Sequence, residues 1–228
     1  MMSLDANFSD NRIESTYIIT LPGNPTSEEL TARCIASLEA VGQPHTLWPG
    51  FDGVEGRPQI PEHLRGLPHV SWPKLVTGKL SWAQVACFMS HYSLWCRCLT
   101  LDRSIAILEH DAIMVKPYMH HRLYNSIVYL GSVEQHRGQQ PIYSTPPHAT
   151  DFNGRLRSLC RAHAYSIDPA VARSLVSYTI QHGIYESLDM YMRADLFPMC
   201  QFDLYAYDLR GETTVKGLDD CLRSKYLP

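Results

Sequence analysis

The first part of the chain alternates between short apolar runs and a segment with helical periodicity. Residues 16–21 form a β-rich apolar run, and residues 22–25, which hold two prolines and a glycine, stop it. Residues 26–29 carry the hydroxyl and carboxylate side chains of a helix start, and apolar residues then recur at helical spacing up to Gly42. With a second strand predicted over residues 45–48, this order favours a parallel α/β sheet.

The middle of the chain repeats this alternation with a longer helix. The pattern predicts a helix over residues 82–101 and a buried strand over residues 104–108. Between the second strand and this helix, residues 49–73 are rich in proline and glycine. We expect them to form a long structured loop near the substrate, because long loops in compact domains are usually functional or disordered.

The last part of the chain continues the same pattern. A strand is predicted over residues 126–130, and a helix is predicted after Asp168-Pro169, a pair that suits the cap and first position of a helix. The chain carries no internal repeat and no convincing linker. Residues 15–228 are therefore predicted to form a single compact α/β domain with a mostly parallel sheet flanked by helices. Residues 1–14 are predicted to form a flexible leader.

Composition and charge narrow the class of protein. Of 228 residues, 45% are hydrophobic and 19% are charged, which is ordinary for a folded globular protein. The net charge of -3 argues against a surface that recruits nucleic acid or anionic membranes. No apolar run reaches the roughly 20 residues that cross a bilayer, and the N-terminus lacks the pattern of a signal peptide. We therefore expect a cytoplasmic protein whose seven scattered cysteines are reduced thiols.

Two carboxylates follow the buried strand predicted over residues 104–108. Glu109 and Asp111 are two residues apart, and side chains at this spacing in a strand point to one side. Ligands of open α/β sheets bind beyond the carboxyl ends of the strands, where this pair is expected. Two hard oxygen ligands suit Mg²⁺ or Mn²⁺ held together with a diphosphate. A solvated strand end explains the same pair equally well.

Two blocks carry a resemblance to a known family. Residues 84–95 read Gln-Val-Ala-Cys-Phe-Met-Ser-His-Tyr-Ser-Leu-Trp, and residues 107–112 read Ile-Leu-Glu-His-Asp-Ala. Both blocks resemble glycosyltransferase family 25, the lipooligosaccharide-type and collagen-type galactosyl- or glucosyltransferases, in its Cys-x-x-Ser-His and Ile-Leu-Glu-Asp-Asp-Ala segments. Shorter likenesses to the family, in matching order, are residues 17–22, Arg33, residues 51–53, residues 164–167 and Leu188-Asp189.

The resemblance implies a fold and a reaction. The fold is GT-A, a Rossmann-like nucleotide-binding sheet joined to an acceptor side. The reaction is the metal-assisted transfer of a hexose-type sugar from a nucleoside-diphosphate sugar, usually a UDP-sugar, to an acceptor hydroxyl with inversion. Mn²⁺ or Mg²⁺ is the expected cofactor, and a surface glycan or lipopolysaccharide is the expected acceptor.

The resemblance also suggests roles for individual residues. Asp111 and Glu109 are the expected metal ligands. An inverting transfer needs a base to take the proton of the acceptor hydroxyl, and Asp189 is the first candidate and Glu186 the second. The residues expected to border the donor are Leu21, Pro22, Arg33, Asp52, Gln84, Ser90, His91, Glu109 and His110. His163 and Tyr165 are expected on the acceptor side. Ordinary structural roles remain open for these residues, such as a core histidine, a surface ion pair or a helix cap.

Two positions depart from the family pattern, since His110 replaces an acid and Gln84 replaces a glutamate. These changes leave open a catalytically inactive module that binds a sugar nucleotide. A second alternative keeps the chemistry and changes the acceptor to a modified nucleic-acid base, as in viral DNA glycosyltransferases. The basic cluster of Arg155, Arg157 and Arg161 favours this reading, and the net charge opposes it. A zinc hydrolase does not fit the spacing of the histidines.

Overall fold

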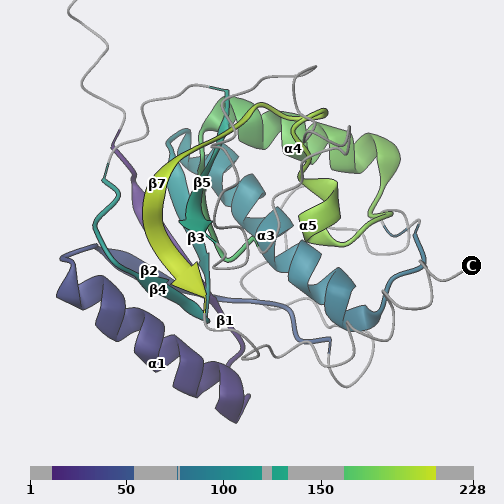
Figure 1. Ribbon diagram of the computed structural model, residues 1–228. Coiled ribbons are helices and arrows are strands. Elements are labelled where there is room, and N and C mark those ends of the chain that lie inside the picture. The colour runs from purple at the N-terminus through teal and green to yellow at the C-terminus, as the bar shows by residue number, and fades with distance from the viewer. Residues whose placement is uncertain (1–11, 54–75, 77, 120–124, 133–161, 209–228) are drawn as a thin grey trace, which may run out of the picture.

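The computed structural model describes residues 12–53, 76, 78–119, 125–132 and 162–208. Its elements follow in the order β1 (Ser15–Thr20), α1 (Pro25–Ala40), β2 (His45–Pro49), α3 (Trp82–Leu101), β3 (Ile105–Glu109), β4 (Ala112–Met114), β5 (Ile127–Ser132), β6 (Ala164–Ile167), α4 (Pro169–His182), α5 (Leu188–Tyr191) and β7 (Met199–Asp208). Figure 1 shows α1 on one face of the sheet and α3, α4 and α5 on the other. The α/β class predicted from the sequence is confirmed.

The described strands form one sheet in the order β2-β1-β3-β6-β5-β7-β4. Strand β1 runs parallel to β2 and β3, and β5 runs parallel to β7, whereas the other three pairings are antiparallel. The prediction of a mostly parallel sheet is therefore wrong, because the sheet is mixed. The strand–helix–strand pattern determines the direction of the first strands, but β6 runs against both of its neighbours.

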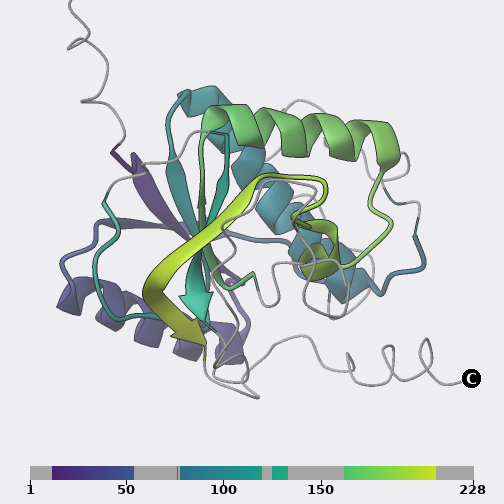
Figure 2. The same ribbon diagram turned by 45° about the horizontal axis from the view of Figure 1, so that its top comes forward.

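The long strand β7 gives the sheet its curl. It pairs with β5 at both of its ends, with a register shift between Tyr129 and Gly131 of β5, and its last part also pairs with β4. Figure 2 shows β7 crossing the sheet as one bent ribbon. Only two residues, His110 and Asp111, separate β3 from β4. Strand β4, at one edge of the sheet, therefore begins close to the carboxyl end of β3.

Alternate residues of the central strands face two layers of the core. Ile107 of β3 packs in the cluster that contains Trp95 of α3, whereas Leu108, its neighbour, packs in the cluster that contains Leu38 of α1. Strands that are covered on both faces read as continuous apolar runs rather than as alternating ones. This two-sided burial explains the apolar run of β3, in which residues 105–108 are all buried.

The two helices that pack together on the second face begin where the sequence predicts. Ser81 caps α3, its hydroxyl accepts the N–H of Gln84, and the side chain of Gln84 accepts the N–H of Ser81 in return. Asp168 caps α4 and accepts the N–H groups of Ala170 and Val171. Among the described helices, none combines the length and the apolar character needed to cross a bilayer.

The start of the chain differs from the prediction. Asn24, and not a residue of the segment 26–29, caps α1, because its side chain accepts the N–H of Ser27 at 3.1 Å and Pro25 takes the first helical position. Of the predicted leader, only residues 12–14 are described, and Ile13 is buried. The predicted loop over residues 49–73 lies outside the described residues after Gly53.

Candidate functional site

A pocket opens where β1, β2 and β3 end against the first half of α3. Ile19 of β1 lies in register with Glu109 of β3, and Thr20 lies in register with Pro49 of β2. Three parallel strands therefore end at one edge, which is where open α/β sheets bind ligands. The predicted site residues that line this pocket are Leu21, Asp52, Ser90, His91, Glu109, His110 and Asp111.

One wall of the pocket is the segment after β2, which Ser90 holds against α3. The Ser90 hydroxyl accepts the N–H of Phe51 at 2.9 Å and donates to the carbonyl of Ala86 at 2.8 Å. The segment lies so close to α3 that a side chain at Gly53 would collide with the backbone of Trp82. Ser90 thus works through the backbone of this wall, which presents the exposed carboxylate of Asp52.

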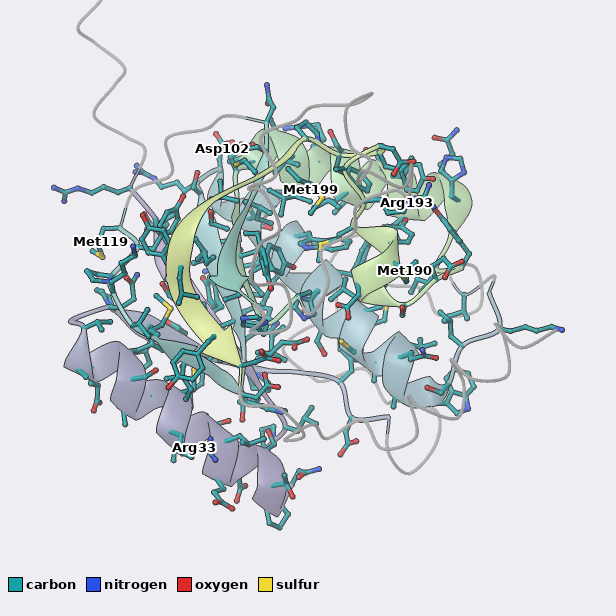
Figure 3. All side chains as sticks on the ribbon, in the orientation of Figure 1. Arg33, Asp102, Met119, Met190, Arg193 and Met199 are labelled. Carbon is teal, nitrogen blue, oxygen red and sulfur yellow. The ribbon has the colours of Figure 1, made fainter. Side chains whose placement is uncertain are left out.

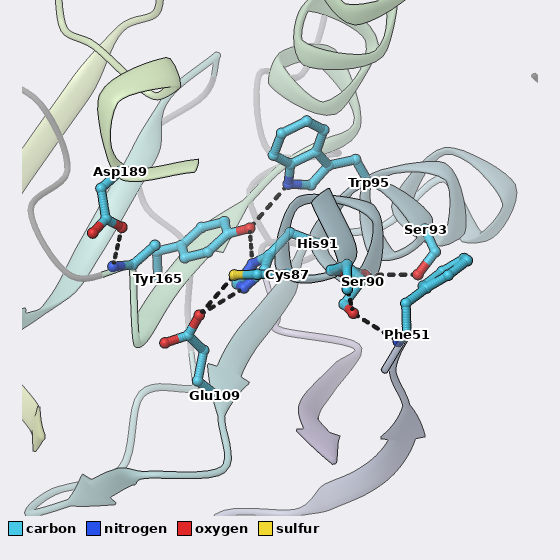
Figure 4. Close-up of polar contacts among 11 residues, drawn as sticks. Phe51, Cys87, Ser90, His91, Ser93, Trp95, Glu109, Tyr165 and Asp189 are labelled. Carbon is cyan, nitrogen blue, oxygen red and sulfur yellow. Dashed lines mark hydrogen bonds and ion pairs between the residues drawn. The ribbon is translucent and has the colours of Figure 1, made fainter. Parts of the chain in front are cut away.

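The floor of the pocket is a chain of hydrogen bonds from α3 to β6 and back to β3 (Figure 4). The indole N–H of Trp95 donates to the hydroxyl of Tyr165 at 2.9 Å. The same hydroxyl lies 2.8 Å from Nδ1 of His91, and Nε2 of His91 lies 3.1 Å from Oε1 of Glu109. Because an indole can only donate, the Tyr165 hydroxyl accepts from Trp95, and because an ionised carboxylate can only accept, Nε2 of His91 donates to Glu109.

This chain of hydrogen bonds keeps Glu109 ionised. Burial raises the pKa of the Glu109 carboxyl, but the hydrogen bond and the charge of His91 oppose it, and His110 and His163 add to their effect. Together they lower the pKa of Glu109 to about 2. At neutral pH the pocket therefore carries a fixed negative charge at Oε1 and Oε2 of Glu109, although the side chain is only 28% exposed.

Cys87 lies on the same floor, and its thiol donates to Oε1 of Glu109 at 3.6 Å. Burial raises the pKa of the Cys87 thiol well above its usual value, and the charges of Glu109, Asp189 and Asp111 raise it further. Three carboxylates from separate positions in the chain thus act on one thiol. The pocket is a region of concentrated negative charge, which suits a cation or a ligand that arrives with one.

Asp111 lines the pocket, but for a different reason than the sequence predicts. Strand β3 ends at Glu109, and His110 and Asp111 form the turn before β4, so the two carboxylates do not share a strand face. Nδ1 of His110 lies 3.0 Å from the Ser27 hydroxyl at the start of α1. Burial lowers the pKa of His110, and the charge of Glu109 opposes this in part.

The two candidate bases differ in their surroundings. Asp189 lies in the first turn of α5, and its Oδ1 accepts the N–H of Ala162 at 3.1 Å. Its charge adds to the effect of burial and of Glu109 in raising the pKa of the Cys87 thiol. Glu186 acts instead on Tyr185, whose pKa is raised by burial and by Tyr178, with a smaller contribution from Glu186. Neither Asp189 nor Glu186 is among the described residues that line the pocket.

Three residues that the sequence predicts near the donor are not among the described residues that line the pocket. Pro22 is exposed in the turn after β1, and Arg33 lies on α1, on the other face of the sheet (Figure 3). Neither lines the pocket. Gln84 closes the capping box of α3 with Ser81. Its side chain thus has a structural role at the start of α3, which a glutamate could fill equally well.

Sequence reasoning does not group Cys87, Trp95 and Tyr165 with His91. The spacing of Cys87, His91 and Trp95, four residues apart each time, is the available signal, because it places them along one face of a helix. Tyr165 is 74 positions from His91 and gives no local signal. Its place on the acceptor side, together with His163, stays a prediction, and both side chains are buried, with exposed fractions of 0% and 1%.

Comparison with known families identifies the chain. The model of the family described as glycosyltransferase family 25 (LPS biosynthesis protein) matches residues 51–192, which is more than half of the chain. The chain belongs to glycosyltransferase family 25. A comparison with curated proteins found no significant match.

Membership of family 25 makes the protein a transferase with two substrates, a sugar donor and an acceptor. The matched segment begins at Phe51, the pocket wall held by Ser90, and it includes Cys87, Glu109 and Asp189. Strand β1 and helix α1 precede the matched segment, so the pocket is built from matched and unmatched parts of the chain.

Proposed function

We propose that the protein has a GT-A-type fold and transfers a hexose-type sugar from a nucleoside-diphosphate sugar, a UDP-sugar, to a hydroxyl of a surface glycan or lipopolysaccharide, with inversion. The observation that carries the proposal is the pocket at the ends of β1 and β3, where an ionised Glu109 and Asp111 face the same space. A site for a diphosphate and its cation belongs at this position in an α/β sheet.

The donor fits the pocket by its two chemical parts. Ile19, Leu21 and Ala86 give an apolar lining on one side, which suits the nucleoside base. The exposed carboxylate of Asp52 is an acceptor for the ribose hydroxyls. Ser90, which also lines the pocket, supports this wall through its hydrogen bond to Phe51 and so orders the donor side.

A hard divalent cation fits the carboxylates of the turn. Oε1 of Glu109 is engaged by His91 and Cys87, so Oε2 of Glu109 and the carboxylate of Asp111 are the oxygens that would hold Mn²⁺ or Mg²⁺. Such ions take one or two carboxylates and complete their shell with water and phosphate oxygens. The bound ion would offset the negative charge of the leaving diphosphate.

Asp189 is the proposed base. It takes the proton of the acceptor hydroxyl as that oxygen forms a bond to the anomeric carbon and the bond from this carbon to the diphosphate breaks. Its Oδ1 accepts the backbone N–H of Ala162, which fixes the carboxylate, and its charge reaches the floor of the pocket. Glu186 is second because its charge acts on Tyr185, whereas the charge of Asp189 acts on Cys87, which lines the pocket.

The departures from the family pattern leave the charged groups of the pocket in place. His110 lies 3.0 Å from Ser27, and Gln84 caps α3, so neither change removes the charge of Glu109 or Asp111. This favours an active enzyme over an inactive binding module. The cluster Arg155 to Arg161, which favours a nucleic-acid acceptor, lies outside the described residues, and the net charge of -3 opposes that acceptor.

A panel of nucleotide sugars with Mn²⁺, scored by the nucleoside diphosphate released, tests the proposal. One UDP-sugar is expected to react, Asp111→Asn to abolish the reaction, and Asp189→Asn to lower kcat by about 10²–10⁴-fold. Asparagine keeps an oxygen for the N–H of Ala162, so the second variant should fold. Glu39→Gln, an exposed change on α1, is the control and should react as the unaltered protein does. Full activity of Asp111→Asn would overturn the metal assignment.

A further inference from the structure

Three side chains on the pocket floor converge on one point. Sγ of Cys87, Nε2 of His91 and a carboxylate oxygen of Glu109 all lie within 4.8 Å of one another. We propose that Cys87, His91 and Glu109 form a binding site for a divalent cation of the Zn²⁺ type, which shares Glu109 with the hard-oxygen site at Asp111. The proposal stands on these three side chains and does not depend on the identity of donor or acceptor.

The distances suit a tetrahedral ion. Zinc binds thiolate at about 2.3 Å and imidazole or carboxylate at about 2.0–2.2 Å, so tetrahedral ligands stand about 3.3 Å apart for nitrogen and oxygen and about 3.5 Å apart for sulfur and oxygen. The observed separations are 3.1 Å from Nε2 of His91 to Oε1 of Glu109 and 3.6 Å from Sγ of Cys87 to the same oxygen. These two separations match the tetrahedral values to within a few tenths of an ångström, and the third, between Sγ of Cys87 and Nε2 of His91, is at most 4.8 Å.

The scaffold around these atoms is rigid. Cys87 and His91 lie one turn apart on α3, and Glu109 is the last residue of β3. The hydroxyl of Tyr165 lies 2.8 Å from Nδ1 of His91 and is itself bonded by Trp95. When Nε2 binds an ion, Nδ1 carries the ring proton and donates it to the oxygen of Tyr165. A metal-binding histidine commonly has such a partner on its second nitrogen, which orients the ring.

The mixture of atoms selects the kind of cation. Sulfur and imidazole nitrogen favour Zn²⁺ over Mg²⁺ or Mn²⁺, which prefer oxygen. The ion displaces the proton of Cys87 to solvent, and the thiolate and the carboxylate together then balance its charge, while the nearby charges of Asp111 and Asp189 add attraction. All three ligand residues line the pocket, so the fourth position faces it and takes a water or a phosphate oxygen. Three protein ligands with one open position are typical of exchangeable zinc sites in enzymes.

The site shares Glu109 with the proposed Mn²⁺ site. Zinc would draw Glu109 and the phosphate oxygens toward α3, so the two ions are expected to compete for the same carboxylate. This makes zinc an inhibitor of a Mn²⁺-dependent transfer, relieved by a chelator selective for Zn²⁺. That consequence rests on the proposed function, whereas binding of the ion itself does not.

Titration of the metal-free, reduced protein with Co²⁺, which replaces Zn²⁺ and absorbs light, tests the site directly. One equivalent of Co²⁺ is expected to give the intense visible bands of a tetrahedral ion and a near-ultraviolet thiolate band, both removed by Zn²⁺ and retained in excess Mg²⁺. Cys87→Ser should remove the thiolate band and weaken binding by about tenfold or more, since even indirect supports of a metal site are worth about 10–100-fold.

Cys98→Ser is the matched control, because Cys98 is also a buried thiol on α3 but bonds to the carbonyl of Arg103. It should leave the cobalt spectrum unchanged, with circular dichroism verifying the fold of both variants. A cobalt spectrum without a thiolate band, or one that persists in Cys87→Ser, would overturn the proposal. If the unaltered protein transfers sugar but gives no cobalt spectrum with a thiolate band, the zinc site alone is refuted. If it gives this spectrum but transfers no sugar, the proposed function alone is refuted.

Discussion

The carboxylate of Glu109 depends on a partner from another element. It ends β3, is mostly buried and carries a full charge, which is costly without compensation. His91 supplies that compensation from α3, and Tyr165 holds the ring of His91 from β6. One charged atom in the pocket is thus supported by three segments of the chain.

We expect His91→Leu to lower the free energy of unfolding by about 1–3 kcal/mol, because a partly buried carboxylate loses its donor. The cost should be much smaller in a Glu109→Gln background, where no charge is left unpaired. Urea unfolding of the four proteins at pH 7, in the presence of a chelator, measures this coupling. Equal costs in both backgrounds would mean that His91 stabilises by packing alone.

Ser90→Ala is expected to lower stability by about 1–2 kcal/mol, because the buried N–H of Phe51 loses its acceptor. The KM for the donor should rise as well, since this N–H holds the pocket wall. Ser174→Ala on α4 is the matched control: its hydroxyl also donates to the carbonyl four residues back, but it is exposed. Chemical unfolding and steady-state kinetics measure both effects. A loss no larger than that of the control contradicts the role given to Ser90.

At the residue level the sequence indicates the charged residues of the site but not the buried residues that hold them in place. Glu109, Asp111 and His91 meet in one pocket, as expected from a buried strand that ends in acids and from the family block before it. Arg33 is not among the residues that line the pocket, since a helix position alone does not say which side of the sheet the helix covers. Tyr165 reaches His91 through a contact between distant segments, which no local pattern encodes.

Helix α3 is the element that joins stability to the site. Its N-terminus carries the capping box of Ser81 and Gln84, and one of its faces carries Cys87, His91 and Trp95 at intervals of one turn. A loosened first turn would shift the wall formed by residues 51–53, which packs directly on it. The order of this terminus therefore affects the shape of the pocket.

Ser81→Ala should cost about 1 kcal/mol, because it removes the acceptor for the N–H of Gln84. Ser187→Ala is the matched control, since Ser187 caps α5 but makes no capping hydrogen bond with its side chain, and it should cost less. Thermal unfolding of both variants against the unaltered protein gives the comparison. Equal losses would show that the capping box adds nothing to α3.

At the level of elements, caps explain both the correct and the incorrect boundaries. Asp168-Pro169 places the start of α4 correctly, because an acid cap followed by proline has few other uses. The start of α1 is placed late because Pro25 reads as a turn residue, whereas it fits the first helical position once Asn24 accepts the N–H of Ser27. Pro25 and Pro169 both take the first position of a helix, but only Pro169 follows a residue, Asp168, that the sequence marks as a cap.

For the whole molecule, a bound ligand should appear as added stability. UDP with Mn²⁺ is expected to raise the melting temperature, because a ligand at about 100 times its Kd adds about 2.7 kcal/mol to the folded state. Asp111→Asn should remove the part of this shift that depends on Mn²⁺, and Glu39→Gln should retain all of it. Differential scanning fluorimetry with and without Mn²⁺ separates the two. A shift in Asp111→Asn equal to that of the unaltered protein contradicts the metal assignment.

The overall arrangement is the part that local patterns describe least. The α/β class follows from strands and helices that alternate along the chain. The direction of β6 and the curl of β7 do not follow, because they depend on which strand edges remain free when the first three strands have paired. Burial over the whole sheet determines the direction and the curl of these strands. The pattern within ten or fifteen residues therefore does not predict them.

The pairing of β7 with β4 also bears on redesign. Asp208, the last residue of β7, lies in register with Ala112, the neighbour of Asp111. A peptide inserted after Asp208 would therefore start at the rim of the pocket, on a short tether. Tethering raises the effective concentration of whatever the peptide captures. Acceptor preference thus becomes a trait that an engineer can add by fusion, with the strands and the helix that form the pocket left untouched.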